Sequence, residues 1–304
     1  MLLALTTLSM YGGTNTVYNF LRNDVSPRAA GMGGSFVSAI EDPNTLFYNP
    51  AGLSTLQHPM GSIGFFKHLI DINAGYVSYS QKIEDIGHLG AGIIYTDYGS
   101  FDKTDESGTI LGTFSAADLA VFLGYSNLLD ENLHYGINVK YIHSSIAEFS
   151  SSGIAADLGI LYNIPDSRVT LGASIRNAGV QISKYGSVEE DLPIDLVVGG
   201  SVVPRGLPLL LNVSFHKLSD AVESFGDRFK SFKVGGEFVL SPSFRLRFGY
   251  DNEKRIDLKV GSSAGLAGFS GGMGIGIGEY RVDYALSSLG QVGDLHRVSI
   301  GATL

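Results

Sequence analysis

From residue 60 to the C-terminus the sequence alternates between apolar and polar residues, and this period of two constrains the fold more than any other feature. In the segment 133–141 every second residue is apolar, while His134, Asn138 and Lys140 fall on the opposite face. Side chains along a strand point alternately to opposite faces, so the pattern predicts strands with one apolar and one polar face. We expect about fourteen strands, at residues 60–69, 72–82, 88–98, 115–128, 132–147, 151–164, 167–178, 192–204, 207–218, 230–240, 243–251, 265–277, 279–288 and 295–304.

The composition narrows the class of β protein. Charged residues make up 17% of the chain, against about 25% in typical soluble proteins, and the mean hydropathy is +0.16. No run approaches the ~20 apolar residues that a transmembrane helix needs. The chain is therefore either a large soluble β protein, such as a β-sandwich, or a transmembrane β-barrel, whose alternating strands escape a hydropathy window.

The connections between the expected strands favour the barrel. Short turns, such as 129–132, alternate with longer connections at about 99–114, 179–191, 219–229 and 252–264. Outer-membrane barrels have short periplasmic turns and longer extracellular loops, and an even number of strands closes without a free edge. We therefore predict an all-β fold, a single transmembrane antiparallel β-barrel over residues 60–304, located in the outer membrane.

The segment 12–59 differs from the rest of the chain. It is rich in glycine, and Ser26-Pro27 has the pattern of a short helix start. Asn49-Pro50-Ala51-Gly52 reads as a turn, either an ordinary loop before the first strand or a plug motif. Because the segment has too few large apolar residues to fold alone, we expect it to pack inside the barrel as a plug or hatch.

The first eleven residues contain an apolar run, Met1 to Leu8, that resembles part of a secretory signal. The run lacks a basic region and a clear cleavage site. Two interpretations stay open, a remnant or truncated signal segment at 1–11 and a mature N-terminus.

Catalytic, metal and cofactor sites are not indicated by the sequence. The 7 histidines have no ligand spacing. The glycine-rich segment 271–278 lacks the Lys-Ser/Thr of a phosphate loop, so we interpret it as a strand that allows close approach of the plug. The net charge is −9 without a basic patch, which argues against a nucleic-acid partner. We expect a protein that is not an enzyme, with no cofactor and no metal.

Charges of both signs lie on the polar faces of the last strands, which suggests an ionic ladder across the barrel wall. Two roles stay open: polar packing of the lumen against the N-terminal segment, and a polar pathway or client contact. The residues of this predicted lumen wall are Lys233, Glu237, Arg245, Arg247, Arg281, Asp283 and Arg297.

Motifs at both ends of the chain resemble those of the PorV/PorQ family. They are Tyr18–Leu21, Ser26–Gly34 and Asn49–Leu53 at the start, with Val282–Leu286 and Gly293–Ile300 at the end. The resemblance implies a fourteen-stranded outer-membrane barrel with its N-terminal segment in the lumen. It also implies support of type IX protein secretion.

The partners implied by this resemblance are outer-membrane lipid, the C-terminal signal domains of secreted proteins and other type IX secretion components. Asn-Pro-Ala alone is shared with the wider FadL-like barrels. The alternative function is therefore a FadL-like channel for uptake of hydrophobic compounds.

Overall fold

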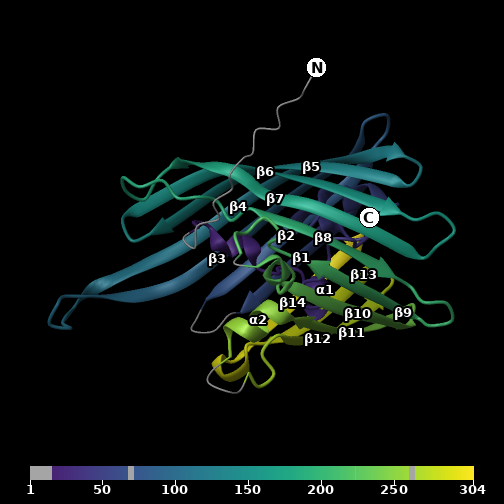
Figure 1. The fold of residues 1–304 in the computed structure, drawn as a ribbon. Coiled ribbons are helices and arrows are strands. Elements are labelled where there is room, and N and C mark those ends of the chain that lie inside the picture. The colour runs from purple at the N-terminus through teal and green to yellow at the C-terminus, as the bar shows by residue number, and fades with distance from the viewer. Residues whose placement is uncertain (1–15, 68–71, 223, 260–263) are drawn as a thin grey trace.

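The computed structural model describes residues 16–67, 72–222, 224–259 and 264–304, which form a closed antiparallel barrel of fourteen strands (Figure 1). Each strand pairs with its neighbours in the sequence, and β1 pairs with β14 to close the barrel. The strands are β1 (Met60–Lys67), β2 (Asn73–Ile83), β3 (Gly87–Thr104), β4 (Ile110–Asp130), β5 (Leu133–Ile146), β6 (Phe149–Asn163), β7 (Val169–Ser183), β8 (Asp195–Val202), β9 (Leu209–Phe215), β10 (Phe232–Ser241), β11 (Phe244–Asp251), β12 (Phe269–Ile277), β13 (Tyr280–Ser288) and β14 (Asp294–Thr303).

The predicted fold class and strand number are confirmed, but one predicted loop is wrong. Residues 99–114, expected as a loop, are mostly strand, because β3 continues to Thr104 and β4 begins at Ile110. The pairing shifts register after Asp97 and then resumes. The rings of Phe101 and Phe114 stack 5.4 Å apart and stabilise this extension. The β3–β4 hairpin therefore reaches well beyond the neighbouring strands (Figure 1).

The two ends of the barrel differ in their connections. At the short-turn end the strands are joined by residues 84–86, 131–132, 164–168, 203–208, 242–243 and 278–279. The opposite, long-loop end carries the connections 184–194, 216–231 and 252–268, which include the 3₁₀ helix η4 (Phe225–Phe229) and the helix α2 (Asn252–Asp257). A short 3₁₀ helix, η5 (Gly290–Val292), joins β13 to β14 at this end.

The barrel is apolar outside and polar inside. Leu123 and Val139 are 64% and 58% exposed on the outer face, whereas Asn138 and Lys140 are 0% and 2% exposed on the inner face. This distribution of apolar and polar side chains is the reverse of that in a soluble protein, and it suits a barrel wall that faces the hydrocarbon of a membrane. Among the described residues, no helix has the length and apolarity of a membrane span.

Residues 16–59, which we call the plug, lie inside the barrel (Figure 1). The described chain begins at Thr16, beside Asp191 at the long-loop end, and reaches β1 at the short-turn end. The plug helices contact the wall on different sides: α1 meets β11 to β14, η2 meets β1 to β3, and η3 meets β3 to β6. These helices are η1 (Asn19–Arg22), α1 (Pro27–Gly31), η2 (Pro43–Phe47) and η3 (Pro50–Thr55). The predicted signal segment 1–11 lies outside the described residues.

Candidate functional site in the barrel lumen

Asn49 is the residue at which the plug is joined to the barrel wall. Its side-chain oxygen accepts a hydrogen bond from the amide of Ala51 at 3.1 Å, which caps η3 at the position where Pro50 begins the helix. Its amide nitrogen donates to the carbonyl oxygens of Val37 at 2.7 Å and Ile160 at 3.0 Å. Ile160 belongs to β6 and Val37 to the plug, so one buried side chain satisfies three backbone groups in three segments.

Next to Asn49 and Pro50 the barrel wall consists of glycines, so no wall side chain keeps the plug at a distance. Gly136 of β5 and Gly159 of β6 are direct cross-strand neighbours. A Cβ atom on Gly136 would lie 2.4 Å from the carbonyl carbon of Pro50, and one on Gly159 would lie 2.0 Å from Oδ1 of Asn49. Glycine is therefore required at both positions for this contact. The rest of the motif is also tight, because a Cβ on Gly52 would lie 2.8 Å from the side chain of Thr45.

Three arginines and three carboxylates form a closed ring of salt bridges between the plug and strands β10, β11 and β13. Each arginine bridges two carboxylates and each carboxylate bridges two arginines. Around the ring the closest nitrogen–oxygen distances are 3.1 Å for Arg28–Asp42, 3.0 Å for Asp42–Arg281, 2.7 Å for Arg281–Asp283, 2.7 Å for Asp283–Arg247, 2.6 Å for Arg247–Glu237 and 3.0 Å for Glu237–Arg28. We call these six residues the ionic ring.

The ionic ring is buried and electrically balanced. The side chains of Asp42 and Arg247 have no exposed surface, and that of Arg281, the most exposed member, is 20% exposed. Two members, Arg28 and Asp42, come from the plug, so the ring fastens the plug to the wall. Removing one partner of a buried ion pair would leave the other charge buried without a counter-charge. In the intact ring, the three positive and three negative charges compensate one another.

The remaining predicted wall residues are divided between a second cluster and an isolated position. Lys233 lies 3.3 Å from Asp251 and 3.8 Å from Asp24 of the plug. Arg297 donates to the backbone oxygen of Asp24 at 2.8 Å and lies over the ring of Phe66. Arg245 stands apart: among the described residues, no carboxylate lies within ion-pair distance of it.

Asp24 is held ionised in this second cluster. Burial by itself raises the pKa of the carboxyl, but the ammonium groups of Lys233 and Lys254 lower the pKa well below the usual range of an aspartate. Lys254 belongs to α2 in a long loop and lies 3.2 Å from Asp24. The cluster therefore links the plug, the wall and a loop at the long-loop end.

A third cluster lies on the opposite wall, and the sequence interpretation did not single it out. Lys140 of β5 lies 2.7 Å from Asp157 of β6 and 2.5 Å from the amide oxygen of Asn177 of β7. Arg176 of β7 pairs with Asp195 of β8 at 2.5 Å. This cluster could have been predicted from the same pattern that indicated the ionic wall of the last strands, namely opposite charges at inward positions of neighbouring strands.

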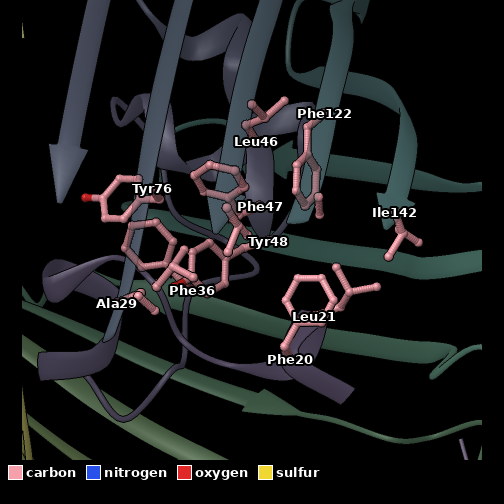
Figure 2. Packing of buried hydrophobic residues seen from close by; sticks show 14 of the residues in the cluster. Phe20, Leu21, Ala29, Phe36, Leu46, Phe47, Tyr48, Tyr76, Phe122 and Ile142 are labelled. Carbon is pink, nitrogen blue, oxygen red and sulfur yellow. The ribbon is translucent and has the colours of Figure 1, made fainter. Parts of the chain in front are cut away.

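The centre of the lumen is filled by apolar side chains between these polar clusters. Figure 2 shows Phe20 and Leu21 of the plug near Ile142 and Phe122 of the wall. Phe47 of the plug packs edge-on against Phe122, with ring centroids 5.0 Å apart, and against Tyr76 at 5.7 Å. In the described structure, then, the plug itself occupies an apolar compartment.

One arrangement superficially resembles a hydrolase triad. The hydroxyl of Ser54 lies 2.7 Å from Nδ1 of His134, whose Nε2 lies 3.2 Å from the amide nitrogen of Asn163. Thr170 donates to the amide oxygen of Asn163 at 2.9 Å, which orients the amide so that its nitrogen donates to Nε2. Nδ1 then carries the imidazole proton and donates to Ser54, whose own hydroxyl donates to the backbone oxygen of Ala51. In this arrangement the histidine donates to Ser54, and the chain of bonds holds η3 against the wall.

Comparison with solved structures gives relatives in fold. The toluene transporter TbuX of Ralstonia pickettii has a TM-score of 0.61 at 13% sequence identity, over 94% of this chain and 98% of its own. CymD, a monoaromatic hydrocarbon channel, has a TM-score of 0.65 at 14% identity, over 92% of this chain and 97% of its own. The toluene transporter TodX of Pseudomonas putida has a TM-score of 0.61 at 17% identity, over 90% and 95%.

No protein-family model matches the sequence, and no curated protein sequence matches it significantly. The chain therefore shares the fold of FadL-like outer-membrane hydrocarbon transporters, at identities that establish the fold alone. This fold agrees with the predicted outer-membrane location.

Proposed function

We propose that this protein is an outer-membrane channel for small hydrophobic compounds. The observation that carries the proposal is the apolar centre of a sealed barrel, in which Phe20, Leu21 and Phe47 of the plug occupy the lumen. A compartment of this chemistry would accept an apolar solute in exchange for the plug side chains. The fold shared with toluene and monoaromatic hydrocarbon channels supports the same class of solute.

The route proposed here requires the plug to move. The ionic ring and the Asn49 contacts hold it near the short-turn end, while Val17 and Phe20 lie nearer the long-loop end. A hydrophobic compound entering from the long-loop end would displace the apolar part of the plug first. The polar contacts would then have to rearrange for release on the other side, which we assign to the periplasm.

Uptake measurements test this proposal. The protein is expressed in a bacterial host without a comparable channel, and accumulation of labelled toluene is compared with that of a polar solute of similar size, such as glycerol. Faster entry of toluene, with glycerol entry unchanged, supports the proposal. Equal acceleration of both solutes would indicate a general pore, and no acceleration of toluene at matched expression would contradict the proposed channel.

Support of type IX secretion, implied by the PorV/PorQ resemblance, is a second candidate. One observation favours it: the β3–β4 hairpin presents Phe101, Ile110 and Leu111 as exposed apolar residues beyond the barrel. Such a surface could bind a C-terminal signal domain. Pull-down from membranes with purified signal domains tests this candidate, and deletion of residues 101–112 should abolish capture while the barrel still folds. Unchanged capture by the deletion variant, or no capture by the intact chain, would count against it.

A further inference from the structure

An apolar groove of about 520 Å³ lies on the outer face of the wall, over strands β5 to β8. Ala173 of β7 has only a methyl group at this surface, between the larger side chains of Leu171 and Ile175 on the same strand, so the wall is hollowed there. The groove follows two rows of cross-strand neighbours that point away from the lumen. The rows are Ile137, Leu158, Ile175 and Leu196, and Tyr135, Ile160, Ala173 and Val198.

A cleft of about 400 Å³ lies at the short-turn end of the same part of the wall. It is formed by the turn between β6 and β7 and the turn between β8 and β9. The amide of Val203 in one turn donates to the carbonyl oxygen of Arg168 in the other at 3.0 Å, which holds the two turns together. Val202 extends the lining to the outer face, where its side chain is 36% exposed. The cleft therefore borders the lipid-facing surface.

The cleft carries an excess of positive charge at an otherwise acidic end of the barrel. The six short turns contain five acidic residues and two basic ones, and the two basic residues, Arg168 and Arg205, both line the cleft. In the described part of the chain, neither arginine has a carboxylate within ion-pair distance. Asp166 also lines the cleft, so two positive charges and one negative charge leave a net charge of +1. This balance matches the single negative charge of a phosphodiester.

The spacing between the cleft and the groove fits one leaflet of a membrane. Val202, at the edge of the cleft, pairs with Val169 of β7, and Ile175 of the groove lies six residues further along that strand. Six residues of strand span about 20 Å, which is about 15 Å of depth at a tilt of about 40°. The hydrocarbon core is about 30 Å thick, so a molecule with its charge in the cleft would reach the bilayer centre in the groove.

We propose that the cleft and the groove together bind one anionic phospholipid of the periplasmic leaflet. The planar guanidinium groups of Arg168 and Arg205 pair with the lipid phosphate, to which arginine can donate two parallel hydrogen bonds. An acyl chain then lies in the groove beside Ala173, where it fills the hollow that the methyl group leaves. The site is on the outside of the barrel, so the inference goes beyond the proposed channel function and does not depend on it.

The absence of tryptophan from the sequence provides a direct assay. Tyr162→Trp places a single fluorescent reporter on the outer face, at the cross-strand neighbour of Leu171 between the groove and the cleft. The full chain is reconstituted in vesicles of phosphatidylcholine that contain increasing fractions of one brominated lipid, which quenches nearby tryptophan. We expect brominated phosphatidylglycerol to bind beside the reporter about fivefold more strongly than brominated phosphatidylcholine. Tyr280→Trp, an outer-face reporter on β13 across the barrel, is the matched control and should show no preference.

Variants with the Tyr162→Trp reporter separate the headgroup from the acyl chain. Arg168→Gln and Arg205→Gln should each lower the preference for phosphatidylglycerol, and together they should abolish it. Lys82→Gln removes an exposed charge from β2 at the same end and should leave the preference unchanged. Ala173→Phe fills the groove while both arginines remain, and it should weaken binding severalfold. The heat-modifiable band confirms that each variant is a folded barrel.

Four outcomes would overturn the proposal. An equal preference at the two reporters would indicate ordinary contact with membrane lipid, and preferential binding of brominated phosphatidylethanolamine would contradict the selection of an anionic headgroup. Complete reversal by an excess of glycerol phosphate would assign the cleft to a soluble phosphate compound instead. Little quenching by any brominated lipid beside the Tyr162→Trp reporter would mean that another protein chain covers the groove.

Discussion

At the scale of single residues, the plug is fixed by polar groups that have no alternative partners. Asn49 satisfies backbone groups of the plug and of β6, and Glu237 satisfies guanidinium groups of the plug and of β11. Both side chains are almost completely buried. A lost partner therefore cannot be replaced by bulk water without opening the lumen.

The first prediction at this scale concerns the ionic ring. Glu237→Gln removes one charge and leaves Arg28 and Arg247 underpaired, so the folded barrel should lose about 3–5 kcal/mol. Urea unfolding in detergent, followed by the shift of the heat-modifiable band, measures the loss. Glu279→Gln, in an exposed turn, is the matched control and should change stability little. A neutral effect of Glu237→Gln would mean that the ring does not stabilise the fold.

The second prediction concerns the turn at Asn49. The double replacement Asn49→Ala and Pro50→Ala removes the cap of η3 and the bond to Ile160. We expect the plug to loosen while the barrel still folds, because the strand pairing does not involve these residues. Limited proteolysis within residues 26–53 and entry of a large antibiotic into cells should both increase. A barrel that no longer folds, or a plug that stays equally protected, would disagree with this assignment.

At the scale of elements, strand alternation was sufficient to locate all fourteen strands, and along residues 133–141 it also gave the side that faces the lumen. It failed at the β3–β4 hairpin, where Asp102 and Lys103 have loop character although the pairing continues as far as Thr104 and Ile110. Outside the hydrocarbon layer a strand needs no apolar face, so the period of two disappears there. The alternation of short and long connections along the sequence cannot distinguish a pair of extended strands from a true loop.

The candidate site was predictable only in part, for a related reason. The wall residues of the ionic ring lie at regular inward positions, and they were identified from the sequence. Their partners Arg28 and Asp42 lie in irregular segments, where no periodicity shows the direction of a side chain. Glycines such as Gly136 and Gly159 are conspicuous in the sequence, but the atoms they make room for are known only from the folded plug.

The prediction at this scale concerns the lipid-facing side of one strand. Met273 and Ile277 both point outward from β12, in its middle and at its short-turn end. Met273→Arg should cost about 2–4 kcal/mol of insertion free energy and Ile277→Arg about 0–1, because a charge is costlier near the bilayer centre. Folding yield into lipid vesicles, measured by the heat-modifiable band, gives the difference. Equal yields for the two variants would contradict the assignment of the outer face to lipid.

At the scale of the whole molecule, the barrel is a rigid wall and the plug is the element that could change its position. The wall is continuous in hydrogen bonding from β1 round to β14. The plug is attached to it by side-chain contacts, chiefly the ionic ring, the Asp24 cluster and Asn49. Passage through the lumen, as proposed, therefore depends on reversible movement of residues 16–59.

Movement of the plug can be tested with a disulfide lock, because the cysteine-free sequence allows one engineered cysteine pair at a time. Asn44→Cys with Ser78→Cys joins the plug to β2, where the two native side chains are 2.8 Å apart. Val139→Cys with Ala156→Cys is the control, since it joins the neighbouring wall strands β5 and β6 on their outer face, away from the plug. Toluene accumulation is measured with each pair oxidised and then reduced. Oxidation should slow uptake for the plug–wall pair alone, and reduction should restore it. Undiminished uptake with the plug locked to the wall would contradict the proposed movement of the plug.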